Sequence, residues 1–193
     1  RAAAELRAVD SLSGQGIESL RQHLLAFAAA QAARSAQGYF RLPIDRAFSV
    51  DGAGVVVTGT AFAGQVALAD ELLLSPSGRR VRVRGLHAQN RQAERAVAGQ
   101  RVALNLAGER LTVEQLHRGD WLLAPALLAP STRLDIELQL LASETRALAH
   151  WTPVHVHLAA QDVSGRVALL DTDSLAPGQS CLAQLVLNAP AHA

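Results

Sequence analysis

From Gly38 onward, short runs of aliphatic and β-branched residues recur about every ten residues, separated by Gly, Asp and Pro. Evenly spaced short strands of this kind are typical of an all-β barrel or sandwich. The runs in the first part are Val55–Thr60, Glu71–Leu74, Val81–Gly85, Arg101–Leu106 and Trp121–Ala124. Those in the second part are Leu134–Leu140, Val154–Leu158, Arg166–Leu170 and Leu182–Leu187. The sequence therefore predicts a mainly β chain with two strand-rich parts.

The stretch between the two parts, "APALLAPST", predicts a linker because it contains Pro125 and Pro130. The second part has only four clear strands, too few to close a barrel of its own. We expect it to lack its final strands or to borrow strands from a neighbour.

One α-helix is predicted ahead of the strands, over residues 15–37. Leu20, Leu24 and Phe27 recur there at helical spacing and Ala fills most of the other positions. Gly38 is the expected stop signal.

Composition narrows the class of protein. A chain of 193 residues, 49% of them hydrophobic, can bury one sizeable core or two small ones. No apolar run reaches the roughly 18 residues that cross a bilayer, so we expect no membrane association. The single cysteine, Cys181, excludes an internal disulfide framework and suits buried filler better than a nucleophile. There is no Met, even at position 1, and we expect a piece of a longer protein.

Charge is unevenly distributed although the formal net charge is only +1. All 18 basic residues are Arg. Residues 39–124 hold 11 Arg against 8 acidic residues, whereas residues 131–193 hold 3 Arg against 6. The first β part is therefore the better candidate for binding an anion.

The glycine-rich stretch "DGAGVVVTG" does not match a nucleotide-binding loop. A phosphate loop requires Gly-x4-Gly-Lys-Ser/Thr before a helix, and a dinucleotide fingerprint also requires a following helix. Here the Lys is absent and a strand follows. We predict a tight turn at Gly52–Gly54 that leads into a buried strand, with Gly59 and Gly64 permitting a bulge and a hairpin turn.

Two histidines, His155 and His157, share one face of a predicted strand. Zinc requires three or four convergent ligands, and the sequence offers no Cys pair or carboxylate at a matching spacing. A structural role for these histidines is favoured and no metal is expected. No Ser-His-Asp or paired-carboxylate constellation indicates catalysis.

Several stretches resemble the elongation factor Tu superfamily of translational GTPases. "LPIDRAFSVDGAGVVVTGTAFAG", "GQRVALNLAG" and "LHRGDWLLA" resemble its second domain, and "WTPVHVHLAAQDVSGRVAL" resembles its third. "DSLSGQGIESLRQHL" resembles the end of the GTPase domain, although Asp10 and Ser11 stand where the superfamily usually has Ser-Ala. The resemblance implies two small β-barrels in tandem after one GTPase-domain helix. The implied parts are a GTPase-domain remnant over 1–38, barrel domain II over 39–124, a linker over 125–131 and a partial domain III over 132–193.

Within the superfamily, "PIDRAF", "LHAQN" and "AGQRVALNLAG" look most like the selenocysteine-specific elongation factors. Such factors are cytoplasmic and deliver selenocysteyl-tRNA to the ribosome at recoded UGA codons. The resemblance places GTP and magnesium in a GTPase domain upstream of residue 1, so we expect no cofactor in this chain and no GTP hydrolysis by it alone. Recognition of the mRNA stem-loop falls to winged-helix domains further along such proteins.

The resemblance also implies a site for the aminoacyl group and terminal adenosine of the tRNA. The matching positions are Asp45, Arg46, Phe48, Thr58, His87 and Arg101. In elongation factor Tu itself, the positions of Arg46 and His87 are acidic and that of Arg101 is a neutral amide, so three positions shift toward positive charge. A selenol is more acidic than a thiol, and two guanidiniums would favour a selenolate over the neutral serine of the precursor tRNA.

Other interpretations stay open for each position. Arg46 could pair with a nearby acid, and Arg101 and His87 could be ordinary solvated strand residues. Phe48 and Thr58 also suit a barrel core. For the chain as a whole, the alternatives are a barrel of another translational GTPase, such as an initiator-tRNA carrier or a ribosome-acting factor, and a protein-interaction barrel that binds no RNA.

Overall fold

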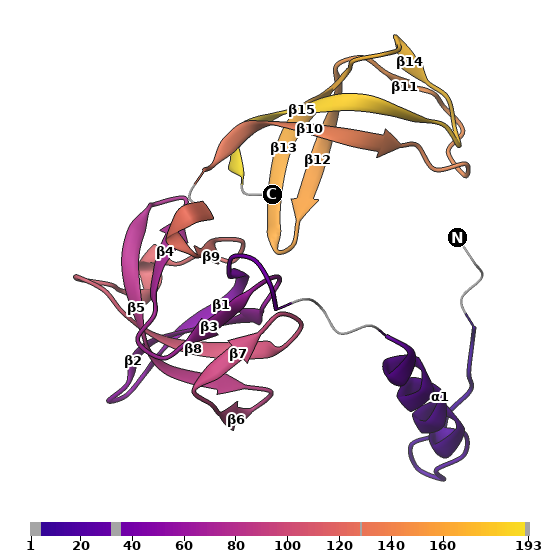
Figure 1. Cartoon of the computed structure of the whole chain (residues 1–193). Coiled ribbons are helices and arrows are strands. Elements are labelled where there is room, and N and C mark those ends of the chain that lie inside the picture. Colours follow the sequence, from indigo (N-terminus) through magenta and orange to yellow (C-terminus); the bar gives the residue numbers. More distant parts are fainter. Residues whose placement is uncertain (1–4, 32–35, 128, 192–193) are drawn as a thin grey trace. The chain divides into compact units, whose positions relative to one another are not determined.

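The computed structural model describes residues 5–31, 36–127 and 129–191. The chain is mainly β, with one α-helix, α1 (Ile17–Ala30), near its N-terminus (Figure 1). Helix α1 and the segment before it form a unit separate from the β region. None of the helices in the described ranges is long and apolar enough to cross a membrane.

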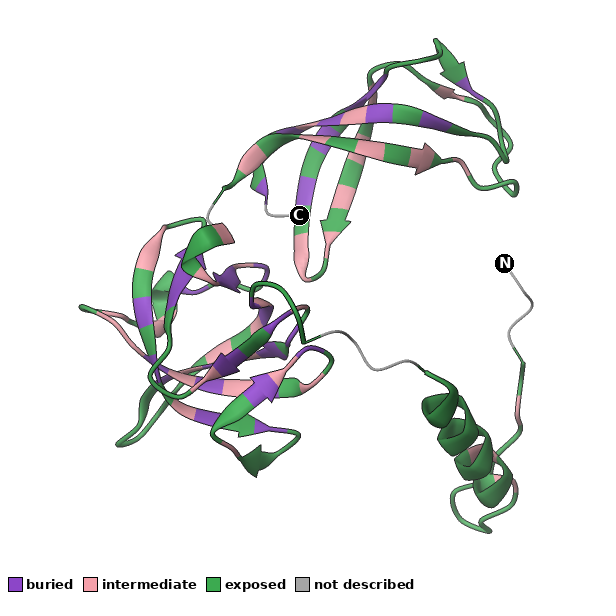
Figure 2. Ribbon diagram, viewed as in Figure 1, coloured by how far each residue is buried: buried purple, intermediate pink, exposed green. Residues whose placement is uncertain are grey.

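Helix α1 is shorter than the sequence predicts. It follows Gly16, which adopts a left-handed conformation with φ 76°, and the backbone is already extended at Gln31. The stop at Gly38 is therefore wrong for this helix, and residues 32–35 of the predicted segment lie outside the described residues. No residue of α1 is buried within this chain, and most of the helix is exposed in Figure 2.

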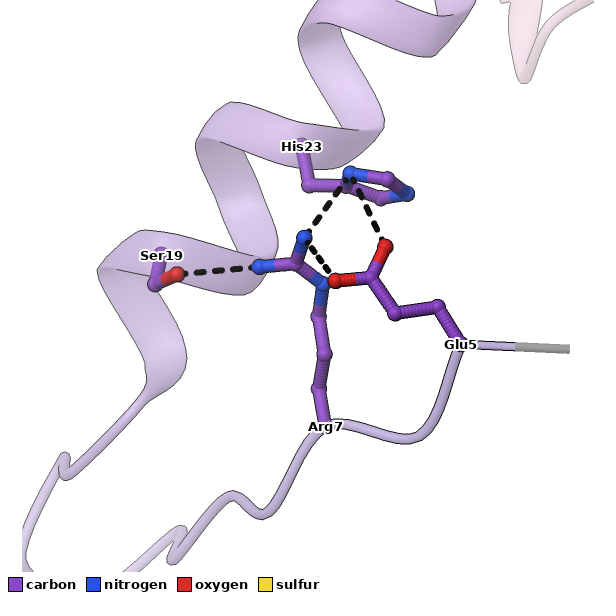
Figure 3. A network of polar contacts seen from close by, with 4 residues as sticks. All are labelled: Glu5, Arg7, Ser19 and His23. Carbon is purple, nitrogen blue, oxygen red and sulfur yellow. Dashed lines mark hydrogen bonds and ion pairs between the residues drawn. The ribbon is translucent and has the colours of Figure 1, made fainter.

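A polar network ties the segment before α1 to the helix (Figure 3). Arg7 pairs with Glu5 at 2.7 Å and donates a hydrogen bond to Ser19 Oγ at 3.1 Å. The Arg7 guanidinium also lies 3.1 Å from His23 Nδ1. These contacts hold residues 5–7 against the first two turns of α1.

The first β part is a closed, antiparallel barrel, as predicted (Figure 1), but it has six strands, whereas the sequence pattern indicated five. Its strand order is β4-β9-β1-β2-β8-β5, and pairing between β4 and β5 closes it. The strands are β1 (Arg41–Val50), β2 (Gly54–Thr60), β4 (Glu71–Ser75), β5 (Arg79–Ala88), β8 (Arg101–Ala107) and β9 (Trp121–Leu123). The short strands β3 (Gln65–Ala67), β6 (Arg91–Gln92) and β7 (Arg95–Val97) pair at its margin, and η1 (Val113–Gln115) and η2 (Pro125–Leu127) are single 3₁₀ turns.

Alternation along the strands builds the barrel core. Inward residues such as Leu42, Ile44, Val57, Leu104 and Leu122 are fully buried, and buried positions alternate with more exposed ones along β2, β5 and β8 (Figure 2). The predicted turn before the second strand is confirmed, because residues 51–53 form the turn that joins β1 to β2. The predicted bulge is also present, in β1 opposite Gly59.

The second β part has its own hydrophobic cluster, which includes Val163, Val167, Ala183 and Leu187. All four predicted strands are confirmed as one antiparallel sheet of order β10-β15-β13-β12. These are β10 (Ser131–Gln139), β12 (Thr152–Leu158), β13 (Gln161–Leu169) and β15 (Ser180–Ala191). Sequence analysis missed the two-residue strands β11 (Leu148–Ala149) and β14 (Ser174–Leu175).

Within the described ranges the second sheet is open, since β10 and β12 each pair along one edge only. Missing or borrowed strands stay a prediction. The two hydrophobic clusters fall within residues 39–124 and 132–193, and the division into domains at those boundaries stays a prediction as well.

Candidate functional site

The outer face of the first barrel carries a row of side chains across four neighbouring strands. Arg46 on β1 is the cross-strand partner of Thr58 on β2, Thr58 of Ala103 on β8, and Ala103 of His87 on β5. Thr58, Ala103 and His87 have buried strand neighbours, which include Val57, Leu86 and Leu104, and Arg46 is itself exposed, so these four residues face outward. Three of the predicted site residues thus lie in one line across the sheet.

The other predicted residues occupy the two adjoining rows. Phe48 is paired with Val56 on one side of the line, and Arg101 with Thr60 on the other. Phe48 is 40% exposed and Thr58 is half-buried on the outer face, so the alternative that placed these two side chains in the barrel core is wrong. The structure brings all six predicted residues onto one face of the barrel.

Asp45 reaches this face because β1 contains a β-bulge. The register moves from Ile44↔Gly59 directly to Arg46↔Thr58, which leaves Asp45 as the extra residue. A bulge redirects a side chain without disturbing the alternation on either side of it. Asp45 accepts a hydrogen bond from Thr58 Oγ1 at 2.6 Å and forms an ion pair with Arg101.

Arg101 completes a closed triangle with Asp45 and Thr58. One guanidinium nitrogen contacts the Asp45 carboxylate and the other donates to Thr58 Oγ1 at 3.3 Å. Partial burial alone raises the pKa of Asp45, but hydrogen bonds from Arg101 and Thr58 and the charges of Arg101 and Arg46 outweigh it and hold that pKa below its usual value. The hydrogen bond to Asp45 in turn raises the pKa of Arg101.

The expectation of two equivalent guanidiniums therefore needs correcting. The charge of Arg101 is balanced by Asp45 in this structure. Arg46 is exposed and has no hydrogen-bond or ion-pair partner among the described residues. The proposed pairing of Arg46 with Asp45 or Asp51 does not occur, and Arg46 is the cation on this row that remains available to a ligand.

A pocket of about 490 Å³ lies on the same face, beside the row. It is lined by Val50, Gly52, Ala53, Val56, Arg84, Gly85, His87, Ala103 and Asn105. Asn105 Nδ2 donates to the carbonyl oxygen of Ala53 at 2.6 Å, and Asn105 Oδ1 is buried with no partner among the described residues. Because most walls are apolar and the polar groups are few, the pocket has the character of a small-molecule site.

Sequence reasoning assigned no role in this pocket to Asn105 or to the apolar residues of the β1–β2 hairpin. In the sequence, Arg82 and Arg84 alternate with Val81 and Val83, which predicts a solvated strand face for Arg84 and leaves contact with a phosphate as an alternative. Arg84 is instead the extra residue of a second bulge, since the register moves from Val83↔Leu106 to Gly85↔Asn105. An apolar wall and a bulge carry no local sequence signal, and only the glycine at position 85 hinted at irregular pairing.

Two histidines of the second β part share one carboxylate. His155 and His157 lie 3.2 Å and 3.8 Å from the same Asp162 carboxylate. In the portion of the chain that the structure describes, no group of three or more His, Cys, Asp or Glu side chains is placed to hold a metal ion. Cys181 is buried, and burial together with the charge of Asp171 raises the pKa of its thiol.

The first barrel and the second β part each match the model of a known protein family. A model of the second domain of elongation factor Tu matches residues 54–123. A model of the β-barrel domain of the selenocysteine-specific elongation factor matches residues 133–193. The selenocysteine-specific elongation factor of Escherichia coli is 46% identical over 189 residues, which is 98% of this chain and 28% of that protein. That of Haemophilus influenzae is 43% identical over 92% of this chain and 27% of its own length.

The chain belongs to the selenocysteine-specific elongation factor family.

Solved structures show the same fold. The apo form of translation elongation factor SelB from Methanococcus maripaludis superposes with a TM-score of 0.82 at 22% identity, covering 96% of this chain and 43% of that one. A bacterial selenocysteine-specific elongation factor gives a TM-score of 0.77 at 24% identity over 94% of this chain and 28% of the other. The chain thus spans less than half of the family members it matches.

Proposed function

We propose that this chain is the aminoacyl-tRNA-binding part of a selenocysteine-specific elongation factor, and that the outer face of its first barrel holds the charged 3′ end. One observation carries the proposal: six residues predicted from the family resemblance come from four strands and lie on one face, beside a largely apolar pocket. In this proposal, the pocket accepts the terminal adenosine and the neighbouring row accepts the amino acid.

The charges of Asp45, Arg46 and Arg101 support a preference for an anionic cargo. Asp45, Arg46 and Arg101 together carry a net charge of +1, and Arg46 is the unpaired member within the described residues. A hydrogen bond from a charged donor contributes about 1.5–3 kcal/mol. One such bond to a selenolate, absent for a neutral seryl group, gives a preference of roughly ten- to hundredfold.

Asp45 has a different role from the two arginines in this arrangement. Its carboxylate holds the Arg101 guanidinium and the Thr58 hydroxyl in place, so Arg101 presents its remaining N–H groups in a fixed orientation. Arg keeps its charge when partly buried, which makes it a better anion ligand here than Lys. Selectivity therefore rests mainly on Arg46, with Arg101 as a preorganised second donor.

The remaining functions of the intact protein follow by proposal from family membership. They are GTP and magnesium binding in a GTPase domain, delivery of selenocysteyl-tRNA to the ribosome in the cytoplasm, and reading of an mRNA stem-loop by other domains. Closure of the GTPase domain over the barrel in the GTP state, and its release after hydrolysis, would hold and then free the cargo.

The test is binding of selenocysteyl-tRNA and seryl-tRNA to the full-length, GTP-bound protein across a pH series. We expect the preference for selenocysteyl-tRNA to collapse as the selenolate is protonated. Arg46→Gln should reduce the preference at neutral pH by about tenfold or more, with little effect on seryl-tRNA. Discrimination that is unchanged in Arg46→Gln and independent of pH would refute the anionic-cargo mechanism.

A further inference from the structure

Arg84 occupies an unusual position on the barrel. It is the extra residue of the bulge in β5, it is exposed, and it lines the pocket opposite the β1–β2 turn. A regular strand at this point would present only Gly85 to the outer face. The bulge therefore adds a cation to the rim of a pocket whose walls are otherwise mostly apolar.

Three other outward arginines of this barrel are engaged within it. Arg80 pairs with Glu71 at 3.4 Å, Arg82 Nε donates to the carbonyl oxygen of Ala69 at 3.2 Å, and Arg101 pairs with Asp45. Arg84 makes no hydrogen bond or ion pair within residues 5–31, 36–127 and 129–191. Its charge at the pocket rim is therefore available to an anionic ligand.

Arg84 is also remote from Arg46, the cation that we assign to the amino acid. It lies on β5 and Arg46 lies on β1, with β2 and β8 between them. Three strand spacings correspond to about 14 Å. A single amino-acid side chain at Arg46 does not span that distance, so Arg84 needs a different part of the ligand.

We propose that Arg84 binds a backbone phosphate of the single-stranded tRNA 3′ end while the adjoining pocket holds the terminal base. This inference rests on the function proposed above. Single-stranded RNA is held by a cation that follows the backbone together with apolar contacts to the bases. The rim and walls of this pocket supply that combination in one place. Arg84 thereby fixes the register of the RNA end, and the choice of amino acid is made elsewhere.

The experiment measures the salt dependence of tRNA binding by the full-length, GTP-bound protein. Each phosphate contact in a single strand contributes about 0.7 to the slope of log K against log salt. Arg84→Gln should lower the slope by about that amount and weaken selenocysteyl- and seryl-tRNA by the same factor, roughly tenfold at low salt. Arg84→Lys keeps the charge and should retain the wild-type slope.

Arg80→Gln is the matched control, because Arg80 lies on the same strand and faces outward but is paired with Glu71. Its slope should equal that of the wild type. An unchanged slope in Arg84→Gln, or weakening confined to selenocysteyl-tRNA, would overturn the phosphate assignment and leave the proposed function intact. A wild-type protein that binds neither tRNA would instead refute the proposed function, and the assignment of Arg84 with it.

Discussion

Gly59 is the residue on which the geometry of the site most directly depends. It lies on β2 opposite Ile44, at the edge of the bulge that delivers Asp45 to the outer face. A Cβ at this position would lie 2.3 Å from the carbonyl oxygen of Pro43 and 2.7 Å from Leu42 Cδ2. Both atoms belong to β1, and the nearer one is a backbone oxygen, which cannot rotate away.

Relief of that clash requires β1 and β2 to separate by close to 1 Å. Overpacking of a buried site costs about 1–3 kcal/mol, and a rigid backbone neighbour places Gly59→Ala at the upper end of that range or above it. We expect urea denaturation of the 193-residue chain, followed by Trp fluorescence, to show a lower transition midpoint with an unchanged m-value. The separation should also disturb the triangle of Asp45, Thr58 and Arg101.

Gly85→Ala is the control, since a Cβ there would meet only Asn105 Cβ at 3.3 Å and Gly85 does not have a positive φ. Its midpoint should change by less than that of Gly59→Ala, because reduced freedom of the unfolded chain offsets part of the crowding. Equal midpoints for Gly59→Ala and the wild type would show that the two strands do not pack as described.

Three further predictions concern stability and ligand binding. Asp45→Asn should cost about 1 kcal/mol or less, because the ion pair is partly exposed. The pKa of Asp45 is lower in the folded state than in the unfolded state, so its carboxylate stabilises the fold fully above the unfolded pKa of about 3.9, and this stabilisation is lost as the pH falls through the folded pKa. The free energies of unfolding of the wild type and Asp45→Asn should therefore converge at low pH. A difference in stability that persists there would contradict this pKa shift. Gly165→Ala should destabilise the second sheet, because the added Cβ would lie 2.6 Å from the carbonyl oxygen of Val186. Hydrogen exchange of the β13 and β15 amides should become faster, and unchanged protection of these amides would refute the prediction. GTP with magnesium should leave the melting temperature of this chain unchanged, and a GTP-dependent shift would show that it contains a nucleotide site.

Most of the strands could be predicted because apolar and polar residues alternate along them, and the apolar residues mark the face that points into the core. Val81 and Val83, for example, alternate with arginines and are buried as expected. The strands β11 and β14 have two residues each, too few to establish a period. The length of α1 was overestimated because the Ala-rich sequence after Ala30 favours helix by propensity, whereas in proteins most helical stability comes from tertiary packing.

The residues of the candidate site could be predicted from the sequence, but the pairing of their charges could not. Family resemblance pointed to residues that the register does bring onto one face, yet it could not show that Asp45 and Arg101 are paired. That pairing depends on a bulge, which depends in turn on the close approach of Gly59 to β1. Pockets present the same difficulty, because Val50 and Asn105 are 55 positions apart in the chain and meet only through the pairing of three strands.

Both charged bulge residues, Asp45 and Arg84, stand outside the alternation that encodes the hydrophobic interior. Excising either one would leave the flanking side chains oriented as before. A substitution at either position therefore leaves the hydrophobic core unchanged, although Asp45 also contributes to stability through its ion pair with Arg101. Substitutions at 45 and 84 should therefore alter ligand contacts on the surface of the barrel more than the packing inside it.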